Sequence, residues 1–163
     1  MIIVLELDQR FKVCKLEIHP EKTKIVYCKD GKRKNTYNGN TKFVFLGYEF
    51  RARAAENKKS KEVFTSYLPA ISPKAEKSIN EKIRELNIRN RSDLSLQEIA
   101  KWINPMIQGW INYYGKYTKS ALLNVFQRLN GTLARWSMKK YLKLKNKKTR
   151  AARHMKELAS KAT

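Results

Sequence analysis

The sequence has few of the side chains that build metal and disulfide sites. Its 163 residues include two cysteines, Cys14 and Cys28, and two histidines, His19 and His154. Two thiols cannot form a disulfide framework, and these four side chains are too few and too scattered for a four-ligand zinc site. We therefore interpret both cysteines as free thiols in a reducing cytoplasm, and we expect no metal site in this chain.

Acidic residues are also scarce, and this scarcity favours a polyanionic partner. The chain has 14 Asp and Glu against 36 Lys and Arg, which gives a net charge of +22. Such an excess is far beyond what solubility requires, and the positive charges repel one another unless an anion neutralises them. We expect that anion to be nucleic acid, RNA in particular, and we regard a membrane surface as the lesser alternative.

The motifs of several enzyme classes are missing as well. The three aspartates, Asp8, Asp30 and Asp93, are not adjacent to one another, whereas nucleic-acid polymerases hold two metal ions between closely placed carboxylates. The sequence also has no G-x-x-x-x-G-K-[ST] phosphate loop, no nucleophile elbow and no H-E-x-x-H. We therefore predict no catalytic residue and no cofactor for this chain alone.

No apolar run is long enough for a membrane span. The opening MIIVLEL is short, and it lacks the basic start and the small-residue cleavage site of a signal peptide. We predict a cytoplasmic protein with no membrane partner.

What is present predicts an α+β fold with a boundary near residue 70. Apolar residues at helical spacing predict an N-terminal helix, and aromatic or β-branched runs between turn signals predict strands. The predicted elements are a helix at 1–14, strands at 23–28, 43–50 and 62–68, a loop or hairpin at 29–40, and a polar connection at 51–61.

The second part of the sequence predicts a bundle of about three helices. Ser72 and Pro73 are typical of a helix start, and Ser95 with Glu98 forms a capping box before the next one. Pro105 predicts a kink or break in that helix, and Thr118 predicts the cap of a third. A basic linker over 143–150 and a short helix over 151–159 follow. We expect two domains, 1–70 and 71–163.

The most informative stretch is residues 102–141, which combine three Trp and four Tyr with Lys and Arg but contain no Asp or Glu. The helical spacing predicts that Trp110 and Trp136 belong to the core. Tyr113, Tyr114 and Tyr141 fit either the core or a surface on which bases stack. Because few acids are near enough to pair with them, we predict RNA contacts for these cations: Lys116, Lys119, Arg128, Arg135, Lys139, Lys140, Lys143, Lys145, Lys147, Lys148 and Arg150.

Four motifs together resemble the reverse transcriptase/maturase proteins encoded by group II introns. The turn P-E-K-T at 20–23 precedes F-V-F-L-G-Y at 43–48, in the order found at the end of the reverse transcriptase palm. The strings G-W-I-N-Y-Y-G at 109–115 and R-W-S-M-K-K-Y at 135–141 look like the maturase-specific region, also called domain X or the thumb. The resemblance covers about residues 2–158.

The resemblance implies a small palm remnant followed by a helical thumb that binds structured intron RNA and assists splicing and mobility. It also implies a possible contact with an RNA/DNA template–primer duplex, near Lys22, Phe45, Leu46, Gly47 and Tyr48. The family's paired aspartates and the Mg²⁺ that they hold have no counterpart here. The alternative is therefore a C-terminal piece of a split RNA-directed DNA polymerase, active only with a separately encoded N-terminal partner.

Overall fold

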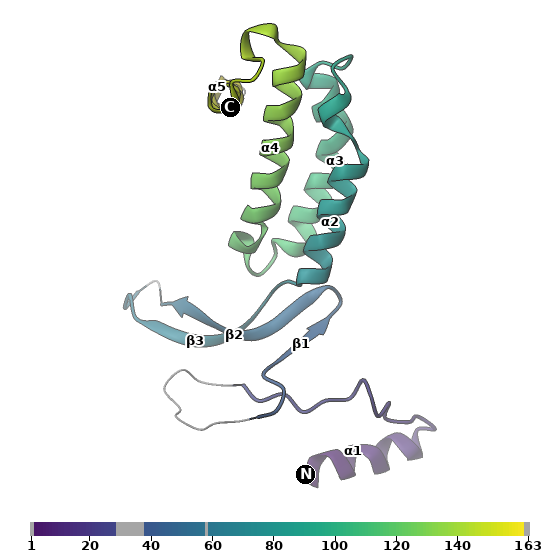
Figure 1. The fold of residues 1–163 in the computed structure, drawn as a ribbon. Coiled ribbons are helices and arrows are strands. Elements are labelled where there is room, and N and C mark those ends of the chain that lie inside the picture. Colours follow the sequence, from purple (N-terminus) through teal and green to yellow (C-terminus); the bar gives the residue numbers. More distant parts are fainter. Residues whose placement is uncertain (1, 29–37, 58, 162–163) are drawn as a thin grey trace.

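The computed structural model describes residues 2–28, 38–57 and 59–161 of the chain. It confirms the predicted fold class: a small antiparallel sheet is followed by a helical bundle (Figure 1). Most of the loop or hairpin predicted at 29–40 lies outside the described residues.

Helix α1 (Ile2–Val13) confirms the predicted N-terminal helix. It lies away from the bundle, beyond the sheet (Figure 1), and its apolar side chains are exposed, Ile3 to 71%. The strand predicted at 23–28 was wrong, because this segment is irregular. A backbone bond from the Tyr27 N–H to the Asn40 carbonyl, 2.8 Å long, does not build a ladder. β-Branched residues form a strand only where a neighbouring strand supplies such a ladder.

The sheet has three antiparallel strands, β1 (Lys42–Phe45), β2 (Tyr48–Glu56) and β3 (Val63–Ile71), in that order. The single strand predicted at 43–50 is a hairpin. Leu46 (φ 48°) and Gly47 (φ 79°) form its two-residue turn, and positive φ at both positions suits the right-handed twist of the flanking strands. β2 also runs through half of the predicted connection, and the edge strand β3 continues past the predicted end and includes Pro69, which edge strands tolerate.

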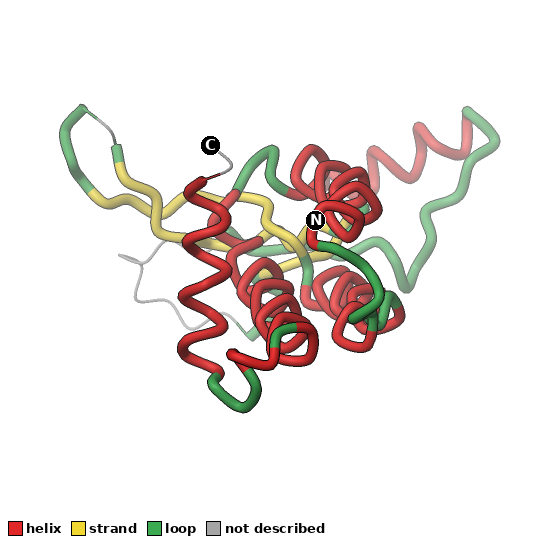
Figure 2. Tube along the Cα trace, turned by 90° about the horizontal axis from the view of Figure 1, so that it is seen from above, coloured by secondary structure: helices red, strands yellow, loops and turns green. Residues whose placement is uncertain are grey.

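Three antiparallel helices form the bundle: α2 (Pro73–Glu85), α3 (Leu96–Tyr114) and α4 (Leu123–Lys140). Both predicted starts are confirmed. The Ser72 hydroxyl accepts from the Ala75 N–H at 3.2 Å, and Ser95 with Glu98 forms a complete capping box. A fourth helix, α5 (Lys148–Lys161), lies across the end of α4 rather than along it (Figures 1 and 2).

Three predictions about helix ends need correction. Of the kink or break predicted at Pro105, the break is wrong: α3 continues to Tyr114, because apolar packing along the helix outweighs the one backbone hydrogen bond that proline removes. Thr118 does not cap α4: it precedes a short 3₁₀ turn, and its hydroxyl donates to the Pro69 carbonyl at 2.8 Å. α5 begins at Lys148, so it includes the end of the predicted basic linker.

The core confirms the predicted roles of two tryptophans. Trp136 is fully buried, and its indole N–H donates to the Arg91 carbonyl at 2.8 Å. Trp110 is half-buried against the same cluster. Trp102, the third tryptophan, is 40% exposed and faces the Arg91 guanidinium. Around Trp136 the buried cluster consists of Ile71, Ile79, Ile83, Ile88, Ile99, Ile103, Leu122, Val125 and Leu129.

Tyrosines join the sheet to the bundle. The Tyr48 hydroxyl donates to the Tyr113 carbonyl, and the Tyr113 hydroxyl donates to the Leu46 carbonyl at 2.9 Å. The Tyr114 ring lies so close to Gly47 that an added Cβ there would be 3.0 Å from the Tyr114 hydroxyl oxygen. Burial raises the pKa of Tyr48 and of Tyr114 above the usual value for a tyrosine. These rings therefore form a packed joint.

Candidate nucleic-acid interface

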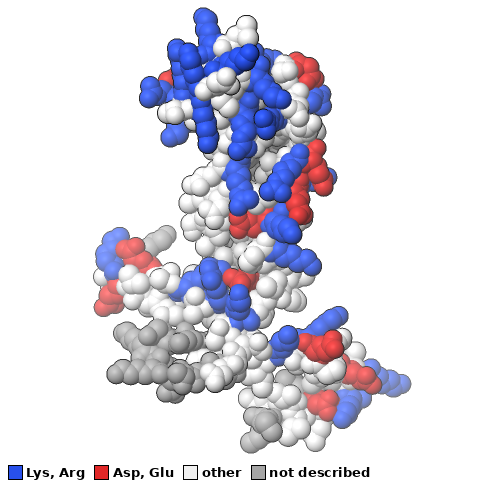
Figure 3. All heavy atoms as spheres, in the orientation of Figure 1, with Lys and Arg blue, Asp and Glu red and all other residues white. Residues whose placement is uncertain are grey.

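The positive charges of α3, α4 and α5 lack acidic partners among the described residues. Among the described residues, every ion pair between Lys or Arg and an acid lies at or before Asp93. On the face drawn in Figure 3, Lys and Arg gather over the end of the bundle where α4 and α5 meet, and Asp and Glu lie mainly beside α2 and around the sheet and α1. This end of the molecule is therefore the most cationic surface in view, and it can attract a polyanion.

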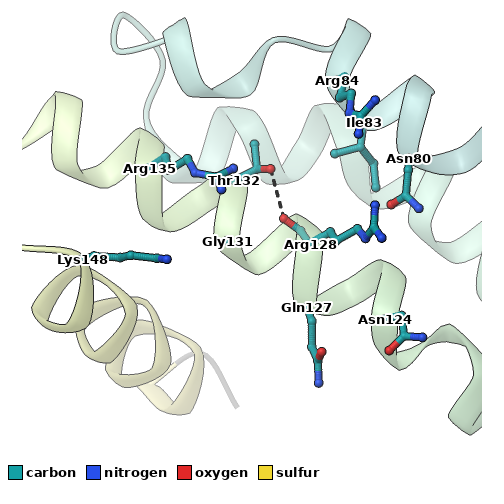
Figure 4. A pocket seen from close by; sticks show the side chains of 10 residues that line it. All are labelled: Asn80, Ile83, Arg84, Asn124, Gln127, Arg128, Gly131, Thr132, Arg135 and Lys148. Atoms are coloured by element: carbon teal, nitrogen blue, oxygen red, sulfur yellow. Dashed lines mark hydrogen bonds between the residues drawn. The ribbon is translucent and has the colours of Figure 1, made fainter. Parts of the chain in front are cut away.

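A groove of about 820 Å³ lies between α2, α4 and α5 (Figure 4). α2 contributes Asn80 and Arg84, α4 contributes Arg128 and Arg135, and α5 contributes Lys148 from its first turn. No acidic side chain lines the groove. The remaining lining residues are Ile83, Asn124, Gln127, Gly131 and Thr132.

A second hollow of about 360 Å³ adjoins the groove near the end of α4. Arg135 lines both, so the two form one continuous cationic surface, which we call the α4 surface. The second hollow is again lined without any acid, by Arg89, Arg135, Met138, Lys139, Leu142, Lys145 and Asn146.

A third hollow of about 880 Å³ lies between α5 and the short turn before it, Leu142–Leu144. Tyr141 stands in it, 38% exposed, with its ring edge-on to Trp136 and to His154. Glu157 makes this hollow less positive than the α4 surface. Its other lining residues are Lys143, Leu144, Thr149, Arg150, Arg153, His154 and Leu158.

The structure brings only part of the predicted RNA-binding set together. The steps of seven and four between Arg128, Arg135 and Lys139 place all three on one side of α4, as the helical spacing indicates. The hollows collect eight of the predicted residues: Arg128, Arg135, Lys139, Lys145 and Lys148 on the α4 surface, with Lys143, Arg150 and Tyr141 in the third hollow.

Other predicted residues lie elsewhere. Lys116 and Lys119 are in the α3–α4 connection, at the sheet end of the bundle. Tyr113 and Tyr114 belong to the joint with the hairpin, which favours the packing role over stacking for this pair. Lys147 is exposed just before α5 and lines none of the three hollows.

Lys139 and Lys140 make structural contacts that the sequence did not indicate. The Lys140 ammonium donates to the carbonyls of Ser92 and Leu94, at 3.1 and 2.7 Å, and the Lys139 ammonium donates to the Asn90 side chain at 2.6 Å. With the indole bond of Trp136, the last turn of α4 thus holds the segment that leads into α3. Lys140 is half-buried there, so part of its charge serves the fold.

The residues that the resemblance places near a primer are not gathered at one site. Phe45 to Tyr48 form the hairpin turn that packs on α3, whereas Lys22 lies in the irregular segment before the sheet. The backbone N–H of Lys22 bonds locally, to the His19 imidazole at 3.4 Å. Phe45 and Leu46 are largely exposed.

Sequence reasoning missed the α2 side of the groove, in particular Asn80 and Arg84, and it also missed Arg89. A signal for Asn80 was present: it directly follows Ile79 in the apolar stripe of α2, and Arg84 comes one turn later. A polar residue at such a position is a candidate for the wall of a groove.

Two further findings bear on partners. In the part of the chain that the structure describes, no three His, Cys, Asp or Glu side chains come together as a metal site would need. Likewise, none of the described helices combines the length and the apolar character of a membrane span.

Comparison with known proteins gives a match to a family model. Residues 76–155, from α2 into α5, match the family model described as "Group II intron, maturase-specific domain". No curated protein and no solved structure matches the chain significantly. The matched range contains the α4 surface and most of the third hollow, and it includes both motifs, at 109–115 and 135–141, on which the resemblance to the maturase region depends. The part of the chain from α2 into α5 is therefore similar to the group II intron maturase-specific domain.

Proposed function

We propose that this chain binds structured group II intron RNA through the α4 surface and so assists splicing and mobility of the intron in the cytoplasm. The observation that carries the proposal is a continuous hollow surface, lined by Arg and Lys without any acid, inside a maturase-specific domain. Phosphate contacts supply most of the affinity of such a surface, and shape and a few stacked bases supply specificity. The chain binds without performing chemistry and holds no metal of its own.

Salt dependence tests the binding. If the surface neutralises about six phosphates, affinity for a transcribed group II intron RNA falls about a thousandfold between roughly 50 and 200 mM KCl. Filter binding across this range measures the slope of affinity against salt. A flat titration would overturn the proposal.

A variant pair locates the binding surface. Arg128→Gln with Arg135→Gln should lower the salt slope by about two, because each phosphate contact contributes about one. The thermal midpoint should stay unchanged, since neither guanidinium makes an ion pair among the described residues. Lys59→Gln with Lys61→Gln, in the β2–β3 connection, removes the same charge far from the bundle and should leave the slope as in the parent.

A second candidate function has its own observation. Phe45, Leu46 and the apolar residues of α1 are exposed, as they would be if another protein surface normally covered them. This favours a split RNA-directed DNA polymerase in which a separately encoded N-terminal part supplies the aspartates and Mg²⁺. Primer extension after mixing the chain with such a part tests it, and no gain over the N-terminal part alone would refute it.

A further inference from the structure

The groove between α2, α4 and α5 contains an unsatisfied hydrogen-bond acceptor. Asn80 is 7% exposed, and its side-chain oxygen has no hydrogen-bond partner among the described residues. A buried polar atom without a partner is unfavourable, and a native structure keeps one where a water, an ion or a ligand completes it. Figure 4 shows Asn80 on the wall of the groove, with the guanidinium of Arg128 extended toward it.

The surroundings of this oxygen determine which ligand can reach it. Arg84, Arg128, Arg135 and Lys148 line the same groove, and no acid lies among them. Arginine side chains bind phosphate through two parallel N–H donors. The Asn80 oxygen is different: although Arg128 extends toward it, no described side chain donates to it, so it can accept from a ligand group that donates. The site therefore suits a molecule that carries a phosphate and a hydrogen-bond donor within a few bonds of each other.

The floor of the groove is open. Gly131 lies within α4, where glycine costs about 1 kcal/mol relative to alanine. A Cβ built on Gly131 would have nothing within 4 Å, so no packing in the folded chain requires glycine there. Thr132 turns its hydroxyl back to the Arg128 carbonyl, at 3.1 Å, and this keeps its polar group out of the groove (Figure 4). Bare backbone at Gly131 leaves room for a ligand to approach closely.

From this geometry we infer that the groove holds one unpaired ribonucleotide of the bound RNA. Its phosphate lies between the arginines, and its ribose 2′-hydroxyl or a base N–H donates to the Asn80 oxygen. Duplex DNA has no donor beside its phosphates, whereas an unpaired ribonucleotide offers both groups. The inference rests on the proposed function and assigns to it a nucleotide-binding site.

The first variant removes the acceptor. Asn80→Leu deletes a buried group that has no partner in the free protein, so its thermal midpoint should equal or exceed that of the parent. Its affinity for a fluorescein-labelled 12-nucleotide oligouridylate should fall about fivefold, the value of one neutral hydrogen bond. The deoxy form of the same oligonucleotide identifies the donor. If the 2′-hydroxyl donates, the preference of the parent for RNA over the deoxy form disappears in the variant; if the base donates, affinity for both forms falls equally.

The second variant fills the floor. Gly131→Ala should raise the thermal midpoint, because alanine favours the helix, and yet lower oligouridylate affinity about tenfold through the added methyl. A substitution at a residue that serves only the fold would not raise stability and lower RNA affinity at the same time.

The third comparison measures the phosphate contact. Arg84→Gln with Arg128→Gln should lower the salt slope for oligouridylate by about 1.4, at about 0.7 per phosphate on a single strand. Lys74→Gln with Lys77→Gln removes the same charge from α2 outside the groove and should not change the slope. If the parent binds with a normal salt slope but Asn80→Leu and Gly131→Ala bind as it does, the nucleotide site is refuted while the proposed function stands. If the parent itself shows no salt-dependent RNA binding, the proposed function fails first.

Discussion

The two parts of the chain place their apolar side chains and their charges in opposite ways. In residues 2–71 large apolar side chains are exposed along α1 and the hairpin, yet several charges are paired: the buried Glu49 carboxylate accepts ion pairs from Lys42, Arg51 and Arg53. In residues 72–161 the apolar stripes meet in one core around Trp136, and after Asp93 no described cation is ion-paired. The first part therefore has exposed apolar surface that a partner can bury. The second part has positive charge that an anion can neutralise.

This contrast shows which partner each part can accept. Exposed apolar surface is satisfied by another protein surface, because burial from water drives such contacts. Cations that make no ion pair and surround a fully packed core can bind a polyanion without a change of fold. Each of the following predictions tests one side of this comparison, beginning with the largest expected effect.

Removing the central side chain of the bundle should have the largest effect. Trp136→Ala loses a fully buried ring and the bond to the Arg91 carbonyl, and it should lower the free energy of unfolding by about 3–5 kcal/mol. Denaturant unfolding followed by far-UV circular dichroism measures this. Trp102→Ala is the matched control, with an expected cost below about 1 kcal/mol, since Trp102 lies on the surface. Equal losses in both variants would mean that the bundle has no dominant core.

The joint between the two parts should be the next most sensitive place. Gly47→Ala requires a positive φ of 79° from alanine and brings a methyl to 3.0 Å from the Tyr114 hydroxyl, so we expect a loss of about 1–3 kcal/mol. Hydrogen exchange should show the loss at β1 and β2, with protection of α4 unchanged. Faster exchange throughout the bundle would show that the two parts fold as one cooperative unit.

The joint also shows what sequence patterns can and cannot predict. Caps depend on neighbours three residues apart, so Ser72, Ser95 and Glu98 were assigned correctly from the sequence, and the apolar spacing placed Trp136 in the core. The hairpin at Leu46 and Gly47 was missed because a nearly continuous apolar run is typical of one strand, and leucine rarely adopts positive φ. The docking of Tyr113 on this turn joins residues 67 positions apart and has no local signal.

The site was predictable to a similar extent. Steps of seven and four on α4 predicted that Arg128, Arg135 and Lys139 share a side, because that is a property of one helix. The groove needs α2 and α5 as well, and a pattern within one helix does not fix how another packs on it. Sequence alone therefore assigned the cations of α4 and missed Asn80.

The last turn of α4 separates structural from free lysines. Lys140→Gln should lower the free energy of unfolding by about 1–2 kcal/mol, because it removes charged donors from the carbonyls of Ser92 and Leu94. Lys145→Gln, at an exposed position on the α4 surface, should cost less than about 0.5 kcal/mol. Thermal unfolding measures both. If both variants keep the parent midpoint, the bonds of Lys140 do not stabilise the bundle.

The smallest expected effect is the loss of one contribution to thermal stability at low pH. The N–H of Ser95, and then its hydroxyl, hold the pKa of Glu98 below its usual 4.5, with a further contribution from Lys140. Because the folded pKa is depressed, this stabilisation is fully present above pH 4.5 and is lost as the pH falls through the lowered value. Glu98→Gln keeps an acceptor for the capping box but cannot titrate. The parent should therefore melt above the variant at pH 7, and the difference should disappear in strong acid. Asp93, whose pKa Arg91 also lowers, titrates in both proteins and cancels from the difference. A difference that stays constant with pH would show that the carboxylate charge does not contribute to the cap.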